Sequence, residues 1–376
     1  MALCVFVLIA SEFMPVSLLT PMANDLGVSE GLTGLGIAIS GAFAVLTSLS
    51  ISMIAGSMNR KMLLLGLTVL MAVSGAVVAL APNYLVYMVG RALIGVVIGG
   101  FWSLSAATAM RLVPSHQVPR ALAIFNGGNA LAMVIAAPLG SYLGSIIGWR
   151  GAFLCLVPVA LIAFVWQWIS LPSMPTRACP AGSGNVLRLL KNPVVALGML
   201  AVSTFFMGQF ALFTYLRPFL EAVTRVDVST LSLVLLTIGV AGFIGTAAIG
   251  RILKWDFYRT LIGIPILMAA IAVALTIFGR NVAAVAALLG IWGLVATAAP
   301  VGWWSWLAMT LPRDAEAGGG LMVAVIQLAI ALGSSIGGLL FDTSGYHSTF
   351  IASAIVLLIA AFLTLLTARS PAPHET

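Results

Sequence analysis

Charged residues are scarce in this sequence. Only 7% of its 376 residues are charged, whereas 61% are hydrophobic. A soluble globular domain usually has about a quarter of its residues charged. The chain therefore lacks the side chains needed to build a surface that faces water. We expect an integral membrane protein whose surface is covered mostly by lipid.

The alternating pattern of a membrane β-barrel is also missing. Strands that cross a membrane carry a period-two pattern over about ten residues, whereas the apolar runs here are long, continuous and rich in Leu, Ala and Met. A spanning helix needs about 20 mainly apolar residues. The sequence thus predicts an all-α membrane protein with twelve transmembrane helices. We place these helices at 2–23, 32–55, 62–82, 85–111, 119–146, 150–171, 193–221, 229–253, 258–278, 282–310, 317–341 and 346–368.

Residues for redox, metal or nucleotide chemistry are few. The three cysteines have no pairing or ligand spacing, the three histidines lie in loops or the tail, and no phosphate-binding Gly-rich loop with Lys-Ser/Thr occurs. We therefore expect no disulfide framework, no metal, no cofactor and no ATP-driven or enzymatic chemistry. The first span lacks a basic leader and contains Glu12, so we interpret it as a mature helix rather than a signal peptide.

The basic residues indicate how the chain is oriented in the membrane, because they are concentrated in alternate loops. Excess Lys and Arg marks cytoplasmic loops, so both termini are predicted to be cytoplasmic. The scattered bases form no nucleic-acid-binding face. Twelve of the seventeen bases lie in the predicted cytoplasmic connections, namely Arg60, Lys61, Arg111, Arg120, Arg177, Arg188, Lys191, Arg251, Lys254, Arg259, Arg313 and Arg369.

The chain is expected to consist of two related six-helix bundles, residues 1–171 and 193–376, joined by a cytoplasmic linker, 172–192. A shift of 197 residues brings the segment 148–153, Gly-Trp-Arg-Gly-Ala-Phe, onto 345–350, Gly-Tyr-His-Ser-Thr-Phe, and a shift of 194 brings Gly56 onto Gly250. Many secondary transporters built from such repeats bind their solute near the middle of the bilayer, between the two bundles.

Glu12 and Arg91 are ionisable residues inside predicted spans. A charge in mid-bilayer costs at least about 2.5–3.5 kcal/mol, so each should face protein or water. Burial favours the neutral form of a carboxylic acid, and Glu12 can therefore load a proton on one side and release it on the other. The alternative for Glu12 is a structural carboxylate, and Arg91 is equally consistent with packing. Arg91 can hold a carboxylate, main-chain carbonyls or a solute, whereas Arg217 is expected to extend to the lipid interface.

Several polar and aromatic side chains are candidates for contact with a solute. Amides suit hydroxyl groups and heterocycle edges, and flat aromatic rings suit a ring-bearing solute. The alternatives are hydrogen bonds between helices for the amides and an interfacial belt for the tryptophans. The candidates are Asn126, Asn129, Gln209, Tyr215, Trp303 and Gln327.

Four features together are typical of one transporter family: the two halves, the basic loop after the second span, Gly90-Arg91 with Gly95, and the Gly/Pro pattern of the fifth span. By these features the whole chain resembles the major facilitator superfamily, in its drug:proton antiporter branch. Three stretches narrow the resemblance, namely 12–19, 100–103, which contains Phe101 and Trp102, and 137–140 leading to 148–150. They look like bacterial inner-membrane purine ribonucleoside exporters, with sugar exporters the next most similar group. This resemblance implies a location in a bacterial inner membrane.

The resemblance implies export of purine ribonucleosides in exchange for protons, by alternating access, in a protein expected to be a monomer. It implies that Arg91 serves proton coupling and that Gly128, Pro138 and Gly140 belong to the antiporter motif. Phe101 and Trp102 are further candidates for contact with a solute. The loop after the second span departs from the family, because Asn59 precedes Arg60 where an aspartate is usual. This departure puts the gating role of the loop in question.

Other functions remain open. Nothing in the fold fixes the direction of transport, so proton-driven uptake is an alternative, and a sugar such as arabinose or an amphipathic drug is the alternative substrate. A membrane sensor or a lipid-modifying enzyme that transports nothing belongs to a different class. The sequence shows no polar catalytic cluster at a membrane face that would favour an enzyme.

Overall fold

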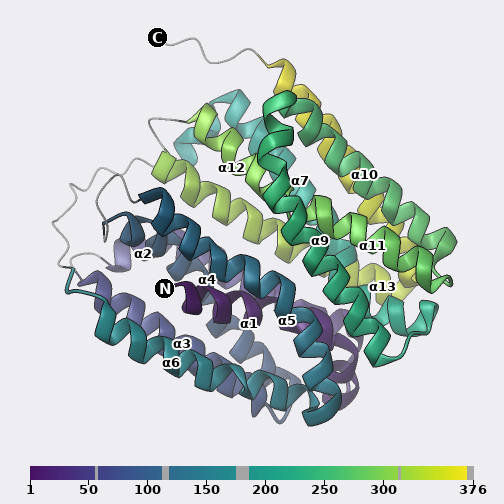
Figure 1. Ribbon diagram of the computed structural model, residues 1–376, viewed down its shortest axis with the longest axis horizontal. Coiled ribbons are helices and arrows are strands. Elements are labelled where there is room, and N and C mark those ends of the chain that lie inside the picture. The colour runs from purple at the N-terminus through teal and green to yellow at the C-terminus, as the bar shows by residue number, and fades with distance from the viewer. Residues whose placement is uncertain (56–57, 112–117, 175–185, 312–314, 371–376) are drawn as a thin grey trace. The chain divides into compact units, whose positions relative to one another are not determined.

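The structure is a computed structural model, and it describes residues 1–55, 58–111, 118–174, 186–311 and 315–370. All regular elements in this part of the chain are helices, as the sequence predicts. Ten helical segments are long and apolar enough to cross a membrane. The chain divides into two compact units, Met1–Gly182 and Ser183–Thr376, which are described separately below (Figure 1).

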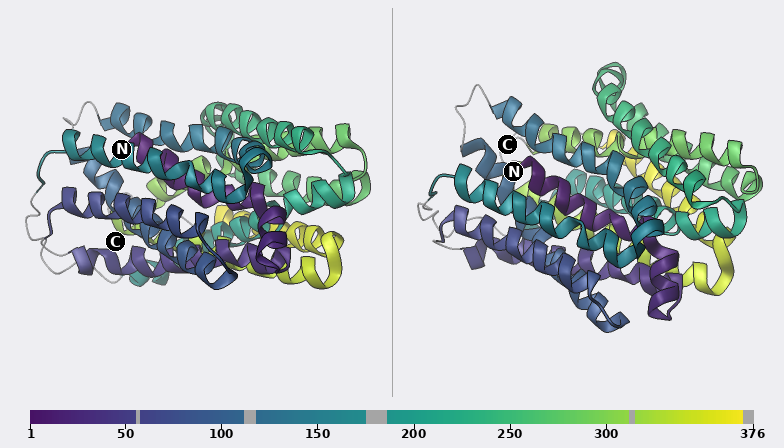
Figure 2. Two further views of the ribbon diagram at one scale, coloured as in Figure 1. Left: turned by 90° about the horizontal axis from the view of Figure 1, so that it is seen from below. Right: turned by 60° about the horizontal axis from the view of Figure 1, so that its bottom comes forward.

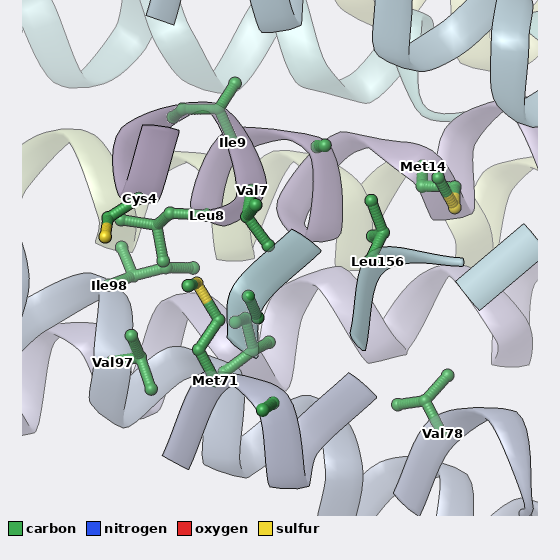
Figure 3. Close-up of a cluster of buried hydrophobic side chains, with 14 of the residues drawn as sticks. Cys4, Val7, Leu8, Ile9, Met14, Met71, Val78, Val97, Ile98 and Leu156 are labelled. Atoms are coloured by element: carbon green, nitrogen blue, oxygen red, sulfur yellow. The ribbon is translucent and has the colours of Figure 1, made fainter. Parts of the chain in front are cut away.

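The described part of the N-terminal unit contains six α-helices. α1 packs against α5, α2 against α4, and α3 against both α4 and α6. Cys4, Leu8, Met71 and Ile98, from α1, α3 and α4, belong to its buried apolar core (Figure 3). The helices are α1 (Ala2–Leu26), α2 (Glu30–Ala55), α3 (Arg60–Ala79), α4 (Tyr84–Arg111), α5 (Val118–Leu154) and α6 (Leu156–Ser170).

The C-terminal unit repeats this scheme with more interruptions. α7 packs against α13, α9 against α11, and α10 against both α11 and α13. Figure 2 shows the helices of each unit running beside one another. The elements are the 3₁₀ helix η2 (Val186–Lys191), α7 (Pro193–Phe213), α8 (Leu216–Phe219), the π-helical turn η3 (Leu220–Thr224), α9 (Val228–Trp255), α10 (Phe257–Phe278), α11 (Val282–Ala296), α12 (Ala299–Thr310) and α13 (Ala315–Arg369).

Two predicted spans are interrupted. The span at 193–221 breaks after α7, and the span at 282–310 breaks between α11 and α12. Pro300, in the first turn of α12, has no N–H with which to continue the hydrogen bonds of α11. A further break, between Leu154 and Cys155, lies outside the predicted loops.

Gly148 and Gly345 turn the chain at corresponding places in the two units. Each lies inside an assigned helix, α5 or α13, yet has non-helical dihedral angles, with φ of 75° and 76°. Side chains are disfavoured at such positive φ values. The two residues are 197 positions apart, and both fall where the sequence predicts a loop between spans.

The helix packing has the same register in both units. A methyl group added at Gly140 would approach Met14, and one added at Gly337 would lie 2.5 Å from the carbonyl oxygen of Ala211. In both pairs the partners are 126 positions apart. Small residues at such points let helices in a membrane pack closely, so the two units share the contact between their first and fifth spans.

The contact of α2 with α4 is repeated by α9 with α11. A methyl group at Gly95 would overlap the carbonyl oxygen of Ser40, and one at Gly293 would overlap that of Ile238. The partners are 55 positions apart in each pair. At these points the two units correspond with a shift of 198 residues.

Candidate functional site

Arg91 lies at the centre of a hydrogen-bond network in the N-terminal unit. The side chain is 1% exposed and projects from α4 toward α1 and α2. Nη1 donates to the carbonyl oxygen of Ser11 at 2.8 Å, and Nη2 donates to that of Glu12 at 3.4 Å. On α2, Nε donates to the carbonyl oxygen of Gly36 and Nη2 to Oγ of Ser40, both at 3.0 Å. One guanidinium thus joins three helices.

The acceptor on Ser11 is available because of a proline. In an α-helix the carbonyl of residue 11 would accept from the N–H of residue 15. Pro15 lies inside α1 and has no N–H. A buried carbonyl without a donor is costly, and Nη1 of Arg91 supplies the missing hydrogen bond.

Glu12 lies next to this network. Its side chain is 6% exposed, and its charge acts electrostatically on Arg91 together with Tyr87, one turn earlier on α4. Tyr87 is fully buried and donates to the carbonyl oxygen of Thr33 at 3.2 Å. The structure therefore brings the two predicted ionisable residues together. Of the partners that the sequence left open for Arg91, main-chain carbonyls are the ones found.

Glycines allow α2 and α4 to pack closely around this network. A methyl group at Gly36 would overlap the Tyr87 hydroxyl, and one at Gly99 would overlap the carbonyl oxygen of Ala44. Gly95 and Gly99 of α4 thus lie directly against the main chain of α2. This approach also keeps the carbonyl of Gly36 within reach of Arg91.

The C-terminal unit has no such ionic pair at the corresponding positions. With the shift of 197 residues seen for Gly148, Glu12 corresponds to Gln209 on α7. With the shift of 198 seen for Gly95, Arg91 corresponds to Leu289 on α11, which is fully buried. The ionisable groups are therefore particular to the N-terminal unit, and the C-terminal unit has an amide and an apolar residue instead.

The C-terminal candidates are largely buried. Tyr215 donates from its hydroxyl to the carbonyl oxygen of Ser334 at 2.7 Å and stacks on Phe341, so its ring already has protein partners. Trp303 is 2% exposed and packs edge-on against Trp306, with ring centroids 5.9 Å apart. Trp303 and Trp306 are therefore buried inside the unit, whereas the alternative interpretation, an interfacial belt, requires exposed rings.

Gln209 and Gln327 come from helices that pack together, α7 and α13. In this contact the facing residues are 126 positions apart, as Gly337 and Ala211 are. Gln327 therefore lies beside residue 201, about two helical turns from Gln209. Oε1 of Gln209 is buried and has no hydrogen-bond partner among the described residues. A buried acceptor without a donor is costly.

The N-terminal candidates lie on α4 and α5. Phe101 is 2% exposed, Trp102 is partly buried, and the side chain of Asn126 lies outside the described residues. Oδ1 of Asn129 is buried without a hydrogen-bond partner in the described part of the chain. In the described residues, no three His, Cys, Asp or Glu side chains are grouped as a metal site would require.

The comparisons with known proteins identify the family. The Major Facilitator Superfamily model matches residues 1–319. The chain belongs to the major facilitator superfamily. It is thus a multi-pass membrane transporter by family and fold, as the sequence resemblance predicts.

Two relatives carry different names. The "Transcription regulatory protein OpdE" of Pseudomonas aeruginosa is 69% identical over 375 residues, which cover 99% of this chain and 93% of that protein. The "Purine ribonucleoside efflux pump NepI" of Salmonella enteritidis is 41% identical over 362 residues, or 96% and 91% of the two chains.

Solved structures agree on the fold. A bacterial homologue of the human lysosomal transporter Spinster, in an inward-facing and unoccupied conformation, superposes with a TM-score of 0.82. It covers 98% of this chain and 95% of its own at 16% identity. The occupied form of that homologue gives a TM-score of 0.79 at 14% identity.

The loop after α2 of this major facilitator transporter is held within its own unit. Oδ1 of Asn59 caps α3 by accepting from the N–H of Lys61 at 3.0 Å and also accepts from the N–H of Met174 at 3.1 Å. Its Nδ2 donates to Ser173 at 2.6 Å, and Nζ of Lys61 donates to the carbonyl oxygen of Trp168 at 2.7 Å. Asn59 thereby ties the start of α3 to the chain that follows α6.

The remaining motif residues differ in their surroundings. Gly128 approaches the carbonyl of Ala2, and Gly140 approaches Met14 and Ser17, so both lie in the contact of α5 with α1. Pro138 lies inside α5 and is partly exposed. Nη1 of Arg60 is buried without a hydrogen-bond partner among the described residues.

The expectation for Arg217 is wrong. Its side chain does not extend to a lipid interface but is 7% exposed, with Nε 2.8 Å from Oε1 of Glu221. Glu221 lies four residues after the arginine, in the π-helical turn 220–224 that follows directly after α8. The spacing of four between opposite charges was a signal for this ion pair.

Sequence reasoning missed the acceptors of Arg91. Ser11, Gly36 and Ser40 have no charge to attract notice, and two of the three act through their main-chain carbonyls. The signal available was Pro15, which leaves the carbonyl four residues earlier without its helical donor. Tyr87, one turn before Arg91, was missed as well.

Proposed function

We propose that this transporter exports small polar solutes, foremost purine ribonucleosides, in exchange for protons. The observation that carries the proposal is the 41% identity to a purine ribonucleoside efflux pump over 96% of this chain. The match leaves out 4% of the chain, which is too few residues at either end to reach Arg91 or the C-terminal candidates.

The proposed proton carrier is Glu12. It is buried beside Arg91, which is pinned to α1 and α2 by four hydrogen bonds. A carboxylate next to a fixed guanidinium is favoured when ionised and loses that attraction when protonated. Protonation of Glu12 therefore changes how strongly α1 is held to α4. This change in helix contact couples proton binding to solute binding from the opposite side of the membrane.

The proposed solute contacts are Phe101, Trp102, Asn126, Asn129, Gln209, Tyr215, Trp303 and Gln327. Asn129 and Gln209 are supported best, because each has a buried amide oxygen that receives no hydrogen bond from the described residues. A purine ribonucleoside offers amine and hydroxyl donors that satisfy such oxygens. Asn59, Arg60, Gly128, Pro138 and Gly140 are proposed to govern gating between the bundles.

The proposed architecture is twelve spans in two six-helix bundles, residues 1–171 and 193–376, which move as halves in alternating access. The linker is 172–192, of which 175–185 lie outside the described residues. The shared registers and the pair Gly148 and Gly345 support the repeat. Counting α5–α6 and α13 as two spans each adds two to the ten candidate segments. We further propose a monomer in a bacterial inner membrane with both termini cytoplasmic.

A regulatory role without transport is the second candidate. It is favoured by the name of the relative that shares 69% identity. Such a membrane sensor binds its solute but carries out no net flux. Sugar or drug export and proton-driven uptake remain alternatives for the transported species and the direction.

Proteoliposomes with an imposed pH gradient test the proposal. We expect guanosine and inosine to move against the proton flow, and arabinose and a cationic dye to be carried poorly. Movement of solute and protons in the same direction would favour uptake by symport. Absence of gradient-driven flux for all four compounds, with binding of one of them retained, would replace the exporter by the sensor.

A further inference from the structure

An apolar groove on the C-terminal unit is open to the membrane. The groove has a volume of about 390 Å³ and lies between α9, α10 and the segment 294–298. Its floor is buried and its rim is exposed. Floor residues include Gly245, Ile249, Ile264 and Val295, and the rim includes Ile252 and Leu267. We call this feature the α9–α10 groove.

One end of the groove is basic. Arg251 precedes the rim residue Ile252, and Arg259 precedes Thr260, which also lines the groove. Arg251 and Lys254 are exposed, and the side chain of Arg259 is 89% exposed. The one carboxylate in this turn is Asp256, which lies 3.1 Å from Arg259. An exposed ion pair of this kind is weak, so the turn keeps a net positive charge.

Trp255 marks the level of the membrane surface in this turn. It lies one helical turn beyond Ile252 and is 88% exposed. Tryptophans gather at the boundary between hydrocarbon and headgroups, where an apolar ring and an N–H group are both accommodated. The basic end is therefore at headgroup level, and the apolar part of the groove extends into the hydrocarbon.

Lys61, in the first turn of α3 of the other unit, provides a contrast. Lys61 donates to the carbonyl oxygen of Trp168, whereas Arg251 and Lys254 form no hydrogen bond or ion pair within the described residues. Arg251 is thus available to an anion, and Arg259 is held only by its exposed ion pair with Asp256. Basic pockets beside transmembrane helices attract anionic headgroups in this way.

We infer that the α9–α10 groove is a binding site for one anionic phospholipid. An acyl chain lies along Gly245, Ile249, Gly263 and Ile264, and the phosphate pairs with Arg251 and Arg259. Any lipid tail can enter an apolar groove, so the basic turn is what confers preference for an anionic headgroup. The site is separate from the solute candidates and does not depend on the proposed transport activity.

Native mass spectrometry of the full-length protein tests this site. Delipidated protein is titrated with phosphatidylglycerol or with phosphatidylethanolamine of the same acyl chains. We expect one phosphatidylglycerol to be retained in preference. The double variant Arg251→Gln/Arg259→Gln should weaken its binding by about fivefold for each base removed, or ~1 kcal/mol each.

Two matched pairs of variants separate this site from general effects. Gly263→Leu fills the groove and should also displace the lipid, and its fold should survive because no atom lies within 4 Å of an added methyl group. Gly250→Leu has equally free space on the opposite face of α9 and should retain the lipid. Arg188→Gln/Arg280→Gln removes two exposed bases elsewhere and should retain it too.

Three outcomes would overturn the inference. These are equal retention of the two lipids by the wild type, unchanged retention by Gly263→Leu, and loss of lipid in the Arg188→Gln/Arg280→Gln control. A species of twice the mass that disappears in Gly263→Leu would assign the groove to a second copy of the chain instead.

Discussion

The Nη1 atom of Arg91 lies 2.8 Å from the carbonyl oxygen of Ser11, the acceptor that Pro15 leaves without a helical donor. A local property of α1 thus determines where the buried cation of α4 is held. The same guanidinium reaches Gly36 and Ser40 on α2, so a displacement of α1 is transmitted to both neighbours.

Replacing Pro15 by alanine should weaken this connection. The new N–H of residue 15 competes with Arg91 for the carbonyl of Ser11. A proline inside an ordinary helix costs about 3 kcal/mol, but here part of the gain on its removal is offset by a lost charged hydrogen bond of about 1.5–3 kcal/mol. We expect a smaller rise in melting temperature for Pro15→Ala than for Pro265→Ala in α10, measured in detergent. An equal rise in both would contradict the role of Arg91.

Arg91→Lys should lower both stability and proton-driven export. Lysine has a single nitrogen and cannot reach the carbonyls of Ser11 and Gly36 in the planar arrangement that Arg91 uses. Each buried acceptor left without a donor costs about 1–3 kcal/mol. Arg280→Lys, on an exposed residue, should change stability by less than about 0.5 kcal/mol. Thermal unfolding and gradient-driven flux are the measurements, and equal effects of the two substitutions would argue against the network.

Gly95→Ala should separate α2 from α4. The added methyl group would overlap the main-chain oxygen of Ser40, which cannot move as a flexible side chain can. Overpacking of this kind costs about 1–3 kcal/mol or more. Gly293→Ala should behave alike, since it would meet the carbonyl of Ile238. Gly66→Ala, with no atom within 4 Å, is the control and should leave the melting temperature unchanged or raised.

Asn59→Ala should cost more than the loss of one helix cap. A cap replaced by alanine costs about 1 kcal/mol, and Asn59 also holds Ser173 and Met174. Asn281, which caps α11 through the N–H of Ala284 alone, provides the comparison. Asn59→Asp keeps both acceptor bonds and should lie between wild type and Asn59→Ala. Equal losses for Asn59→Ala and Asn281→Ala would mean that the bonds to Ser173 and Met174 contribute nothing.

The main features of the fold could be predicted from the sequence because lipid imposes a strong constraint. Scarce charge and long continuous apolar runs predict helices, because a helix satisfies its own main-chain hydrogen bonds in lipid. Gly148 and Gly345 were placed in corresponding loops by a weak sequence repeat. The interruption before Pro300 and the π-helical turn at 220–224 were missed. Both lie within continuous apolar runs, in which composition alone does not show where the backbone hydrogen bonds change.

The candidate site was predictable only in part. An ionisable residue in a span attracts attention by its cost, so Glu12 and Arg91 could be found. Their partners could not, because main-chain carbonyls are present at every residue and only tertiary packing selects those of Ser11 and Gly36. The correspondence of Glu12 with Gln209 likewise required the observed helix register.

Glu12→Gln should uncouple export from protons. The amide has nearly the shape of the carboxylic acid but cannot ionise, and Gln209 provides such an amide at the corresponding position of the other unit. Gradient-driven export should fall to the level of empty vesicles, while exchange of solute down its own gradient continues. The dependence of that exchange on pH should flatten, because the group that titrates has been removed. Glu30→Gln, in the first turn of α2, removes the same charge away from Arg91 and should leave gradient-driven export intact. If Glu12→Gln still accumulated solute against its gradient, the carboxylate would be structural and protons would have to pass through another group.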